Sequence, residues 1–276
     1  MAAPPTVIVS RVNARVKQLR GAFAGSARLG AGLVAIEGET LLQEALRSGL
    51  ALKTVFVSER REAPWWVPRG VEVLYLTGEV FASAVDTAHP QGIAGLVEPP
   101  VWGMEPVASA GGFLLIAAGM QDPGNMGTLV RSAEAFGASA VLTAPGTVSE
   151  WNQKAVRASA GSVFRVPVVG VTEGEVEALR AKGVRVYAAV AGDAGAVPVG
   201  EIDLRGACAV MIGNEGAGIA EEWLALADAL VTIPMPGRVE SLNAGVAGSL
   251  LLYEAARQRA GSVAAAMNGT GVARAR

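Results

Sequence analysis

The chain has 276 residues, which is enough for two modest domains with a substantial core. It is 51% hydrophobic, has a formal net charge of -2, and contains one cysteine and one histidine. This composition excludes an internal disulfide, a cysteine-based zinc site and a multi-histidine metal site, so we expect no bound metal. A serine–histidine–aspartate triad would have to use His89, which lies in the turn-like stretch HPQG.

The N-terminal stretch MAAPPTVIVSR shows no targeting signal, because it lacks a charged n-region and contains two prolines. The longest uncharged runs are shorter than the ~18 apolar residues that a membrane span requires, and they contain glycine. We therefore expect a cytoplasmic protein that does not insert into a membrane.

Basic residues are concentrated at the beginning of the chain. Residues 1–36 contain five basic residues and no acidic one, which leaves a charge of about -7 on the remainder. A basic arm on an acidic body favours the capture of a polyanion such as RNA. The alternative is a solvated amphipathic helix face. The residues that we expect to bind RNA are Arg11, Arg15, Lys17 and Arg20.

The first part of the chain predicts a small α/β domain over residues 1–100. Val12, Val16 and Leu19 recur at helical spacing in VNARVKQLRGAFAG, and ETLLQEALRSGL predicts a second helix. The segments LKTVFVS, VEVLYLT and GIAGLVE predict strands. Prolines and glycines without periodicity then indicate a linker at residues 101–111.

Strands and helices alternate regularly over residues 112–260. The predicted strands are FLLIAAGM, ASAVLTA, VFRVPVV, VRVYAAV, ACAVMIG and ALVTIP. The predicted helices are NMGTLVRSAEAFG, WNQKAVRASAGS, EGEVEALRAKG and SLNAGVAGSLLLYEAARQR. This alternation predicts a mainly parallel sheet with helices on both faces. We expect residues 261–276 to form a flexible tail.

Three loops follow strands of this second part, where ligands of open α/β sheets bind. They are VAGD after Val190, GNEG after Ile212 and PMPGRVES after Ile233. The glycines of the second loop are spaced G-x-x-G-x-G, which differs from the dinucleotide fingerprint G-x-G-x-x-G. The spacing therefore disfavours an oxidoreductase on a Rossmann sheet.

Three segments together resemble the motifs of the SpoU/TrmH RNA ribose 2'-O-methyltransferases of the SPOUT class. They are DPGNMGTLVRSAEAFGA (122–138), VMIGNEGAGI (210–219) and VTIPMPGRVESLNAGVAGSLLLYEAAR (231–257). VNARVKQLRG, VAIEGETLLQEAL and HPQGIAGLVE are similar to the family's substrate-binding domain. The resemblance implies a C-terminal α/β/α SPOUT domain with a deep trefoil knot, preceded by a small N-terminal α/β domain of L30e-like type. It also implies S-adenosyl-L-methionine as cofactor and a homodimer with active sites shared between subunits.

The resemblance assigns roles to individual residues. The residues expected to hold the cofactor, largely through their backbone, are Ala189, Gly213, Asn214, Gly216, Ile233, Met235 and Leu242. The polar residues expected to be catalytic are Asn125, Arg131, Glu215, Ser241 and Asn243.

Several of these polar residues also have structural interpretations. Asn125 could cap its helix, Ser241 could cap the last helix with Asn243 in its first turn, and Arg131 could form a salt bridge. The resemblance implies that Arg131 handles the proton, acting on a cofactor in the partner subunit, but a guanidinium is a poor base because its pKa exceeds ~12. We therefore expect Arg131 to hold a 3'-phosphate and to stabilise developing alkoxide charge, while water, phosphate or Glu215 takes the proton.

The function implied by the resemblance is S-adenosylmethionine-dependent methylation of a ribose 2'-hydroxyl in RNA. We expect 23S rRNA rather than tRNA as substrate, because the long N-terminal domain resembles that of the rRNA-modifying members. A tRNA ribose 2'-O-methyltransferase, and a non-catalytic RNA-binding or ribosome-assembly protein on the same fold, are the alternatives.

Overall fold

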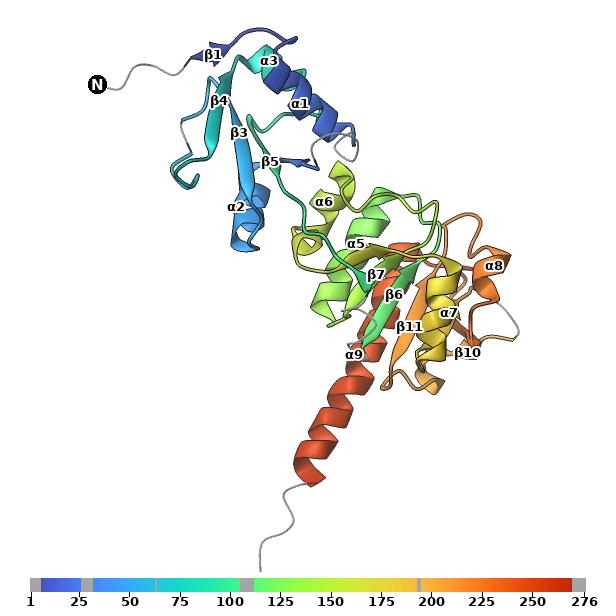
Figure 1. The fold of residues 1–276 in the computed structure, drawn as a ribbon. Coiled ribbons are helices and arrows are strands. Elements are labelled where there is room, and N and C mark those ends of the chain that lie inside the picture. The colour runs from blue at the N-terminus through green and yellow to red at the C-terminus, as the bar shows by residue number, and fades with distance from the viewer. Residues whose placement is uncertain (1–5, 26–31, 63, 105–111, 193–194, 270–276) are drawn as a thin grey trace, which may run out of the picture. The chain divides into compact units, whose positions relative to one another are not determined.

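The structure is a computed structural model that describes residues 6–25, 32–62, 64–104, 112–192 and 195–269 (Figure 1). The chain divides into two compact units. The first is drawn from residues 1–101 together with 151–165, and the second from residues 102–150 together with 166–276. Most of the expected linker, residues 105–111, lies outside the described residues.

The first unit is built on a five-stranded mixed sheet in the order β1-β4-β3-β5-β2. Strands β1, β4 and β3 are parallel, whereas β5 is antiparallel to both β3 and β2. The carboxyl ends of β3 and β4 therefore share one edge with the amino end of β5. The strands are β1 (Val7–Ile8), β2 (Val34–Glu37), β3 (Leu52–Ser58), β4 (Glu72–Leu76) and β5 (Ile93–Val97).

Helices cover both faces of this sheet. Helices α1 (Ala14–Phe23) and α3 (Gly78–Ala82) belong to the hydrophobic cluster that includes Ala94 and Leu96 of β5. Because successive strand residues face opposite sides, Gly95 faces the other helix, α2 (Glu39–Arg47). A Cβ at Gly95 would lie 2.7 Å from Leu42 Cδ2, so glycine allows α2 to pack closely.

The first unit is completed by residues 151–165, which we expected within one continuous C-terminal domain. They form α6 (Gln153–Ser159) and the 3-10 helix η2 (Ser162–Phe164). The buried Gln153 Nε2 donates to Ala35 O of the edge strand β2 over 2.8 Å. Arg165 Nη1 donates to Glu44 Oε1 of α2 over 2.5 Å.

The second unit is built on a seven-stranded parallel sheet in the order β10-β12-β9-β11-β6-β7-β8. Of the predicted strand VFRVPVV, only its end forms a strand, because Phe164 instead stacks on Trp151 in the first unit. The strands are β6 (Phe113–Ala117), β7 (Ala140–Thr143), β8 (Val168–Gly170), β9 (Arg185–Ala189), β10 (Val197–Pro198), β11 (Cys208–Ile212) and β12 (Ala229–Thr232).

Helices α7 (Glu173–Ala181) and α8 (Glu221–Leu224) pack on one face of this sheet, and α5 (Pro123–Ala135) and α9 (Ala244–Gly269) on the other (Figure 1). A short 3-10 helix, η3 (Val199–Glu201), follows β10. Helix α9 continues through residues 261–269, part of the expected tail, and residues 270–276 lie outside the described residues. Within the described residues no helix is long and apolar enough to cross a membrane.

Small residues bring α5 and α9 together. A Cβ at Gly248 of α9 would overlap Leu129 Cδ2 of α5, so the missing side chain of glycine lets the two helices pack closely. One turn away, the hydroxyls of Ser132 and Ser249 form a 2.7 Å hydrogen bond between the two helices.

Asp228 connects α7, β9 and β12. Its Oδ2 accepts a hydrogen bond from Val186 N at 2.8 Å, and its Oδ1 accepts one from Arg180 Nη2 at 2.6 Å. The Arg180 guanidinium thereby holds the pKa of the Asp228 carboxyl below its usual range. The two hydrogen bonds of Asp228 fix the positions at which β9 and β12 begin. Because the two strands are parallel, these bonds also determine where both strands end, at the opposite edge of the sheet.

We predict that Gln153→Met destabilises the protein by roughly 1–3 kcal/mol, because the buried Ala35 carbonyl loses its donor while side-chain length is kept. Denaturant unfolding measures this difference. Arg157→Ala, on the exposed side of the same helix, should change stability by less than about 0.5 kcal/mol. Equal stability of Gln153→Met and the wild type would show that this bond contributes nothing.

Candidate active site

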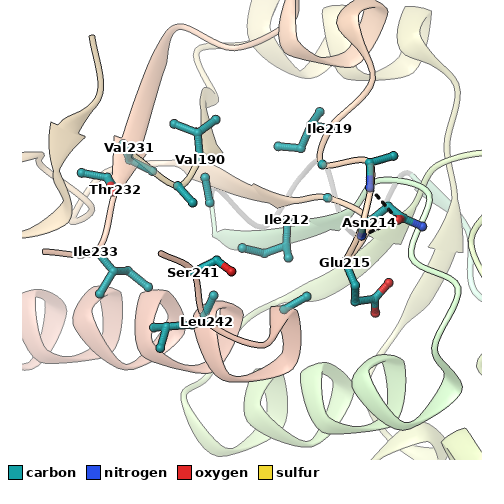
Figure 2. Close-up of a pocket in the computed structure, with 18 of the residues that line it drawn as sticks. Val190, Ile212, Asn214, Glu215, Ile219, Val231, Thr232, Ile233, Ser241 and Leu242 are labelled. Atoms are coloured by element: carbon teal, nitrogen blue, oxygen red, sulfur yellow. Dashed lines mark hydrogen bonds between the residues drawn. The ribbon is translucent and has the colours of Figure 1, made fainter. Parts of the chain in front are cut away.

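A pocket of about 580 Å³ lies at the carboxyl ends of β9, β11 and β12 (Figure 2). Strand-end residues form its floor, and the loops after β11 and β12 form its walls together with the first turn of α9. Apolar side chains such as Val231 and Ile233 lie on one side, and the polar side chains of Asn214 and Glu215 lie on the other (Figure 2).

The loop after β11 is held by the side chain of Asn214. Its Oδ1 accepts hydrogen bonds from Gly216 N at 2.8 Å and Ala217 N at 3.0 Å, and its Nδ2 donates to Gly119 O at 3.1 Å. Its backbone also pairs with Gly218 in both directions. The loop is therefore closed by its own hydrogen bonds.

Gly213 is required by the loop itself. A Cβ at this position would lie 2.6 Å from Ile219 N and closer still to the Gly218 carbonyl group. Both Gly213 and Gly216 line the pocket, and close approach of their backbone to the cofactor stays a prediction. Gly216 lines the pocket and has room for a Cβ, which would lie 3.7 Å from Asn214 Oδ1.

Glu215 is oriented by Asn125, which lies 90 residues earlier in the chain. Asn125 Nδ2 donates to Glu215 Oε1 over 2.6 Å, so the first and second motifs meet at the pocket wall. The interpretation of Asn125 as a helix cap is wrong, because Asp122 is the N-cap of α5 and accepts from Asn125 N at 2.8 Å.

Asn243, rather than Ser241, caps α9. The helix begins at Ala244, and Asn243 Oδ1 accepts a hydrogen bond from Val246 N at 3.2 Å. Ser241 instead lines the pocket beside Leu242 (Figure 2). The capping interpretation of Ser241 is therefore wrong.

Arg131 lies on α5 with an exposed side chain and does not line the pocket of its own chain. The structural interpretation of Arg131 is a salt bridge within its own chain. No ion pair of Arg131 is found with any residue that the structure describes.

The structure therefore brings together most of the residues singled out from the sequence. Those that line the pocket are Ala189, Gly213, Asn214, Glu215, Gly216, Ile233, Met235, Ser241 and Leu242. Asn125, Arg131 and Asn243 do not line it. Sequence reasoning missed other lining residues. They include strand ends such as Val231 and Thr232, which their position alone could have indicated, and residues of helices, namely Leu224 of α8 and Ala247, which lies one turn into α9.

The predicted RNA-binding residues lie on or near α1, and three of them contact the first unit itself. Arg15 pairs with Glu72 at 2.9 Å, and the more exposed Arg11 pairs with Glu79 at 3.5 Å. Arg20 donates to the backbone and hydroxyl oxygens of Ser83. Lys17 is exposed.

The pocket has the size and chemistry for a nucleoside joined to an amino acid. Its volume is within the usual range for small-molecule sites. The apolar side of Val231 and Ile233 suits a flat base, Glu215 offers a carboxylate on the other side, and Ser241 offers a hydroxyl beside Leu242. No cluster of three or more His, Cys, Asp or Glu side chains able to hold a metal ion occurs in the described part of the chain.

Comparison with known proteins agrees with this geometry. The model of the SpoU rRNA Methylase family matches residues 112–253, and that of the MRM3-like substrate binding domain matches residues 13–95. The chain belongs to the SpoU rRNA methylase family.

Relatives match along almost their whole length. The 23S rRNA (guanosine(2553)-2'-O)-methyltransferase RlmP of Bacillus subtilis is 35% identical over 247 residues, which covers 89% of this chain and 97% of the relative. The 23S rRNA (uridine(2479)-2'-O)-methyltransferase of Streptomyces viridochromogenes is 32% identical over 91% of this chain and 92% of its own. The crystal structure of the SpoU methyltransferase AviRb from the same organism, in complex with AdoMet, is 30% identical, has a TM-score of 0.79, and covers 90% of this chain and 98% of its own.

We predict that Gly213→Ala and Gly216→Ala differ sharply. The first should lose roughly 1–3 kcal/mol of stability, because its Cβ overlaps the backbone of the same loop, and it should weaken cofactor binding. The second should stay within about 0.5 kcal/mol of the wild type. Thermal unfolding and calorimetric titration with S-adenosylhomocysteine measure both effects. A fully stable Gly213→Ala protein would contradict the packing argument.

Proposed function

We propose that this chain is an S-adenosylmethionine-dependent RNA methyltransferase that methylates a ribose 2'-hydroxyl in 23S rRNA. The observation that carries the proposal is the 2.6 Å bond from Asn125 to Glu215 at the wall of a cofactor-sized pocket. Support for rRNA comes from the full-length relatives, which are named as 23S rRNA 2'-O-methyltransferases. The proposal includes the cytoplasm as the place of action and a trefoil knot in the second unit.

The pocket residues would hold the cofactor mainly by shape and backbone groups. Ile233, Met235 and Leu242 would enclose the base, and the loop that Asn214 closes would present backbone groups at Gly213 and Gly216. Because this loop is already fixed by its own bonds, little conformational entropy is lost on binding. Ala189 would contribute from the end of β9.

S-adenosylmethionine, when bound, supplies a methyl carbon activated by a sulfonium. The chain must align the ribose hydroxyl with that carbon and remove its proton. Glu215 offers a carboxylate that Asn125 orients at the pocket wall, so it would accept a hydrogen bond or the proton from the hydroxyl. Ser241 would position the ribose, and Asn243 would act indirectly, by fixing the start of α9.

Arg131 would serve the pocket of a second copy of the chain. Its side chain is exposed and lies outside the pocket of its own chain, which supports a role across a subunit interface. There its guanidinium would bind the phosphate next to the reacting ribose and stabilise charge on the attacking oxygen.

An apolar stripe on α9 supports the homodimer. Val246, Leu250 and Tyr253 follow one another at spacings of four and three residues and are 47%, 42% and 52% exposed. They therefore lie on one helical face, and Tyr253 contacts the ring of Phe136 at the end of α5. Contiguous exposed apolar side chains of this kind mark protein interfaces. We propose that a second copy covers this stripe, next to the helix that carries Arg131.

We predict that the wild type transfers tritiated methyl groups to rRNA at ribose 2'-oxygens, and that Arg131→Ala reduces transfer at least about 100-fold. The variant should bind S-adenosylhomocysteine normally, because Arg131 does not line its own pocket. Scintillation counting with nuclease mapping of the product measures transfer, and calorimetry measures binding. Absence of methylated rRNA with the wild type would exclude the proposed function.

Mixed dimers test whether the site is shared. Gly216→Val should obstruct the pocket in a loop that tolerates a Cβ. In a dimer with Arg131→Ala, one site would combine an intact pocket with an intact arginine. Activity should then return to about half of the wild-type value. An inactive mixture, with heterodimers confirmed by native mass spectrometry, would place Arg131 in the site of its own chain.

We predict that Leu250→Glu produces a monomer that binds cofactor but does not transfer methyl groups, because a buried unpaired carboxylate opposes association. Analytical ultracentrifugation measures the mass, and the tritium assay measures transfer. Lys182→Glu, at the exposed end of α7 on the other face of the sheet, makes a larger charge change and is the control. A dimeric Leu250→Glu protein would show that the stripe is not the interface.

A further inference from the structure

The first unit has a second pocket, of about 520 Å³, at an edge of its own sheet. It is lined by residues that follow β3, begin α3 and precede β5. These include Arg60, Gly78 and Gln91. None of the residues used in the proposed methyl transfer lies there.

Buried and half-buried carboxylates fix the walls of this pocket. Glu37, which is 3% exposed, accepts hydrogen bonds from Gln91 N and from the Thr87 hydroxyl. Arg61 donates to Gln91 O at 2.7 Å and to Glu39 at 2.7 Å. The turn before β5 is therefore tied both to the end of β2 and to the segment after β3.

The segment between β3 and β4 carries an exposed tryptophan on an anchored backbone. Trp66 Nε1 donates to Glu39 Oε1 at 2.7 Å, the same carboxylate that binds Arg61. Its neighbour Trp65 is 90% exposed. A tryptophan that is this exposed contributes little to the core, so its flat ring is available to a ligand.

The segment that contains Trp65 also carries positive charge. Arg60 and Arg69, in the same segment, are exposed and have no ion pair or hydrogen bond with the described residues. Arg60 lies against the pocket, since a Cβ at Gly78 would be 3.8 Å from its Nε. The nearby carboxylate of Glu79 pairs with Arg11, and that of Glu59 accepts a hydrogen bond from Gly78 N.

We propose that Trp65, Arg60, Arg69 and the adjoining pocket form a binding site for an unpaired nucleotide of the substrate RNA. The base stacks on Trp65, and the phosphate beside it binds Arg60. This inference rests on the proposed function, because it takes RNA as the ligand. The proposed site is distinct from the basic residues of α1. Of those, Arg15 forms an ion pair with Glu72, and Arg20 donates a hydrogen bond to Ser83 O.

The combination of groups favours single-stranded RNA over a duplex or a protein partner. A stacked, paired base cannot reach a protein ring, whereas unpaired bases stack on aromatic and arginine side chains. Arginines precede and follow Trp65 along the connecting segment, whereas the stripe on α9 consists of successive exposed apolar residues. The neighbouring Trp66 is tied to Glu39, which lowers the conformational entropy that this part of the segment loses on binding.

The test uses fluorescein-labelled oligo(A) and oligo(U) of roughly 12 nucleotides, and the duplex of the two, with the full chain. Trp65→Ala should weaken binding of the single strands about tenfold and leave duplex binding unchanged. Trp65→Phe should restore most of the affinity. Arg60→Ala should lower the slope of log affinity against log salt by about one. Lys53→Ala, at the other end of β3, removes one charge and should change none of these values.

Methyl transfer to rRNA separates this inference from the proposed function. Trp65→Ala should raise the KM for rRNA and keep kcat and cofactor affinity. If the wild type methylates rRNA and Trp65→Ala behaves identically in both assays, the proposed site is wrong and the function stands. If the wild type binds single strands through Trp65 and never methylates RNA, the proposed function is wrong and the binding site stands. Equal losses for single strands and duplex, or a change in oligomeric state, would overturn the assignment.

Discussion

The closed turn that Asn214 holds is the constraint on which the active-site geometry depends. One carboxamide satisfies two N–H groups of its own loop and one carbonyl of the segment after β6. The turn is tight enough that position 213 must be glycine. With the loop fixed in this way, Glu215 is presented to Asn125, and the first two motifs meet. This wall of the pocket is therefore held by the chain's own hydrogen bonds, which lowers the entropy cost of recognition.

Each unit has a pocket at one edge of its sheet, and the residues of the surrounding loops suit a different ligand in each. In each, strands end at one edge of a sheet and short loops at that edge line a pocket. In the second unit the loops contain small residues and leave room for a cofactor. In the first unit the loops carry arginines and a tryptophan, which suit the exposed bases and phosphates of RNA. Glu37 in the first unit and Asp228 in the second each accept a hydrogen bond from a backbone N–H group. These bonds set the positions of the turn before β5 and of the start of β9.

Local patterns were sufficient to predict much of the fold and the position of the pocket. The segment LKTVFVS forms β3 from Leu52 to Ser58 as predicted, because alternating and β-branched residues are a local signal. Strand ends and glycines located the loops that line the pocket. Long-range contacts could not be predicted. They include the bond from Gln153 to Ala35, the ion pair of Arg15 with Glu72, and the overlap that makes Gly213 necessary. The sequence suggested Ser241 as the cap of α9, whereas Asn243 is the cap in the structure. A difference of two residues is the usual uncertainty in the position of a helix end.

Residues 151–165 belong to the first unit, although the sequence on either side of them belongs to the second. This arrangement has a consequence for biosynthesis and for engineering. During translation the hydrogen bond from Gln153 to Ala35 O cannot form until residues 151–165 have left the ribosome, so the first unit is completed only after residues 102–150 of the second unit have been synthesised. A chimera that exchanges the first unit between relatives by a single cut near residue 101 would separate Gln153 from its own acceptor. An exchange of the complete first unit therefore has to transfer two segments of the chain, and the second of them lies between the two parts of the second unit.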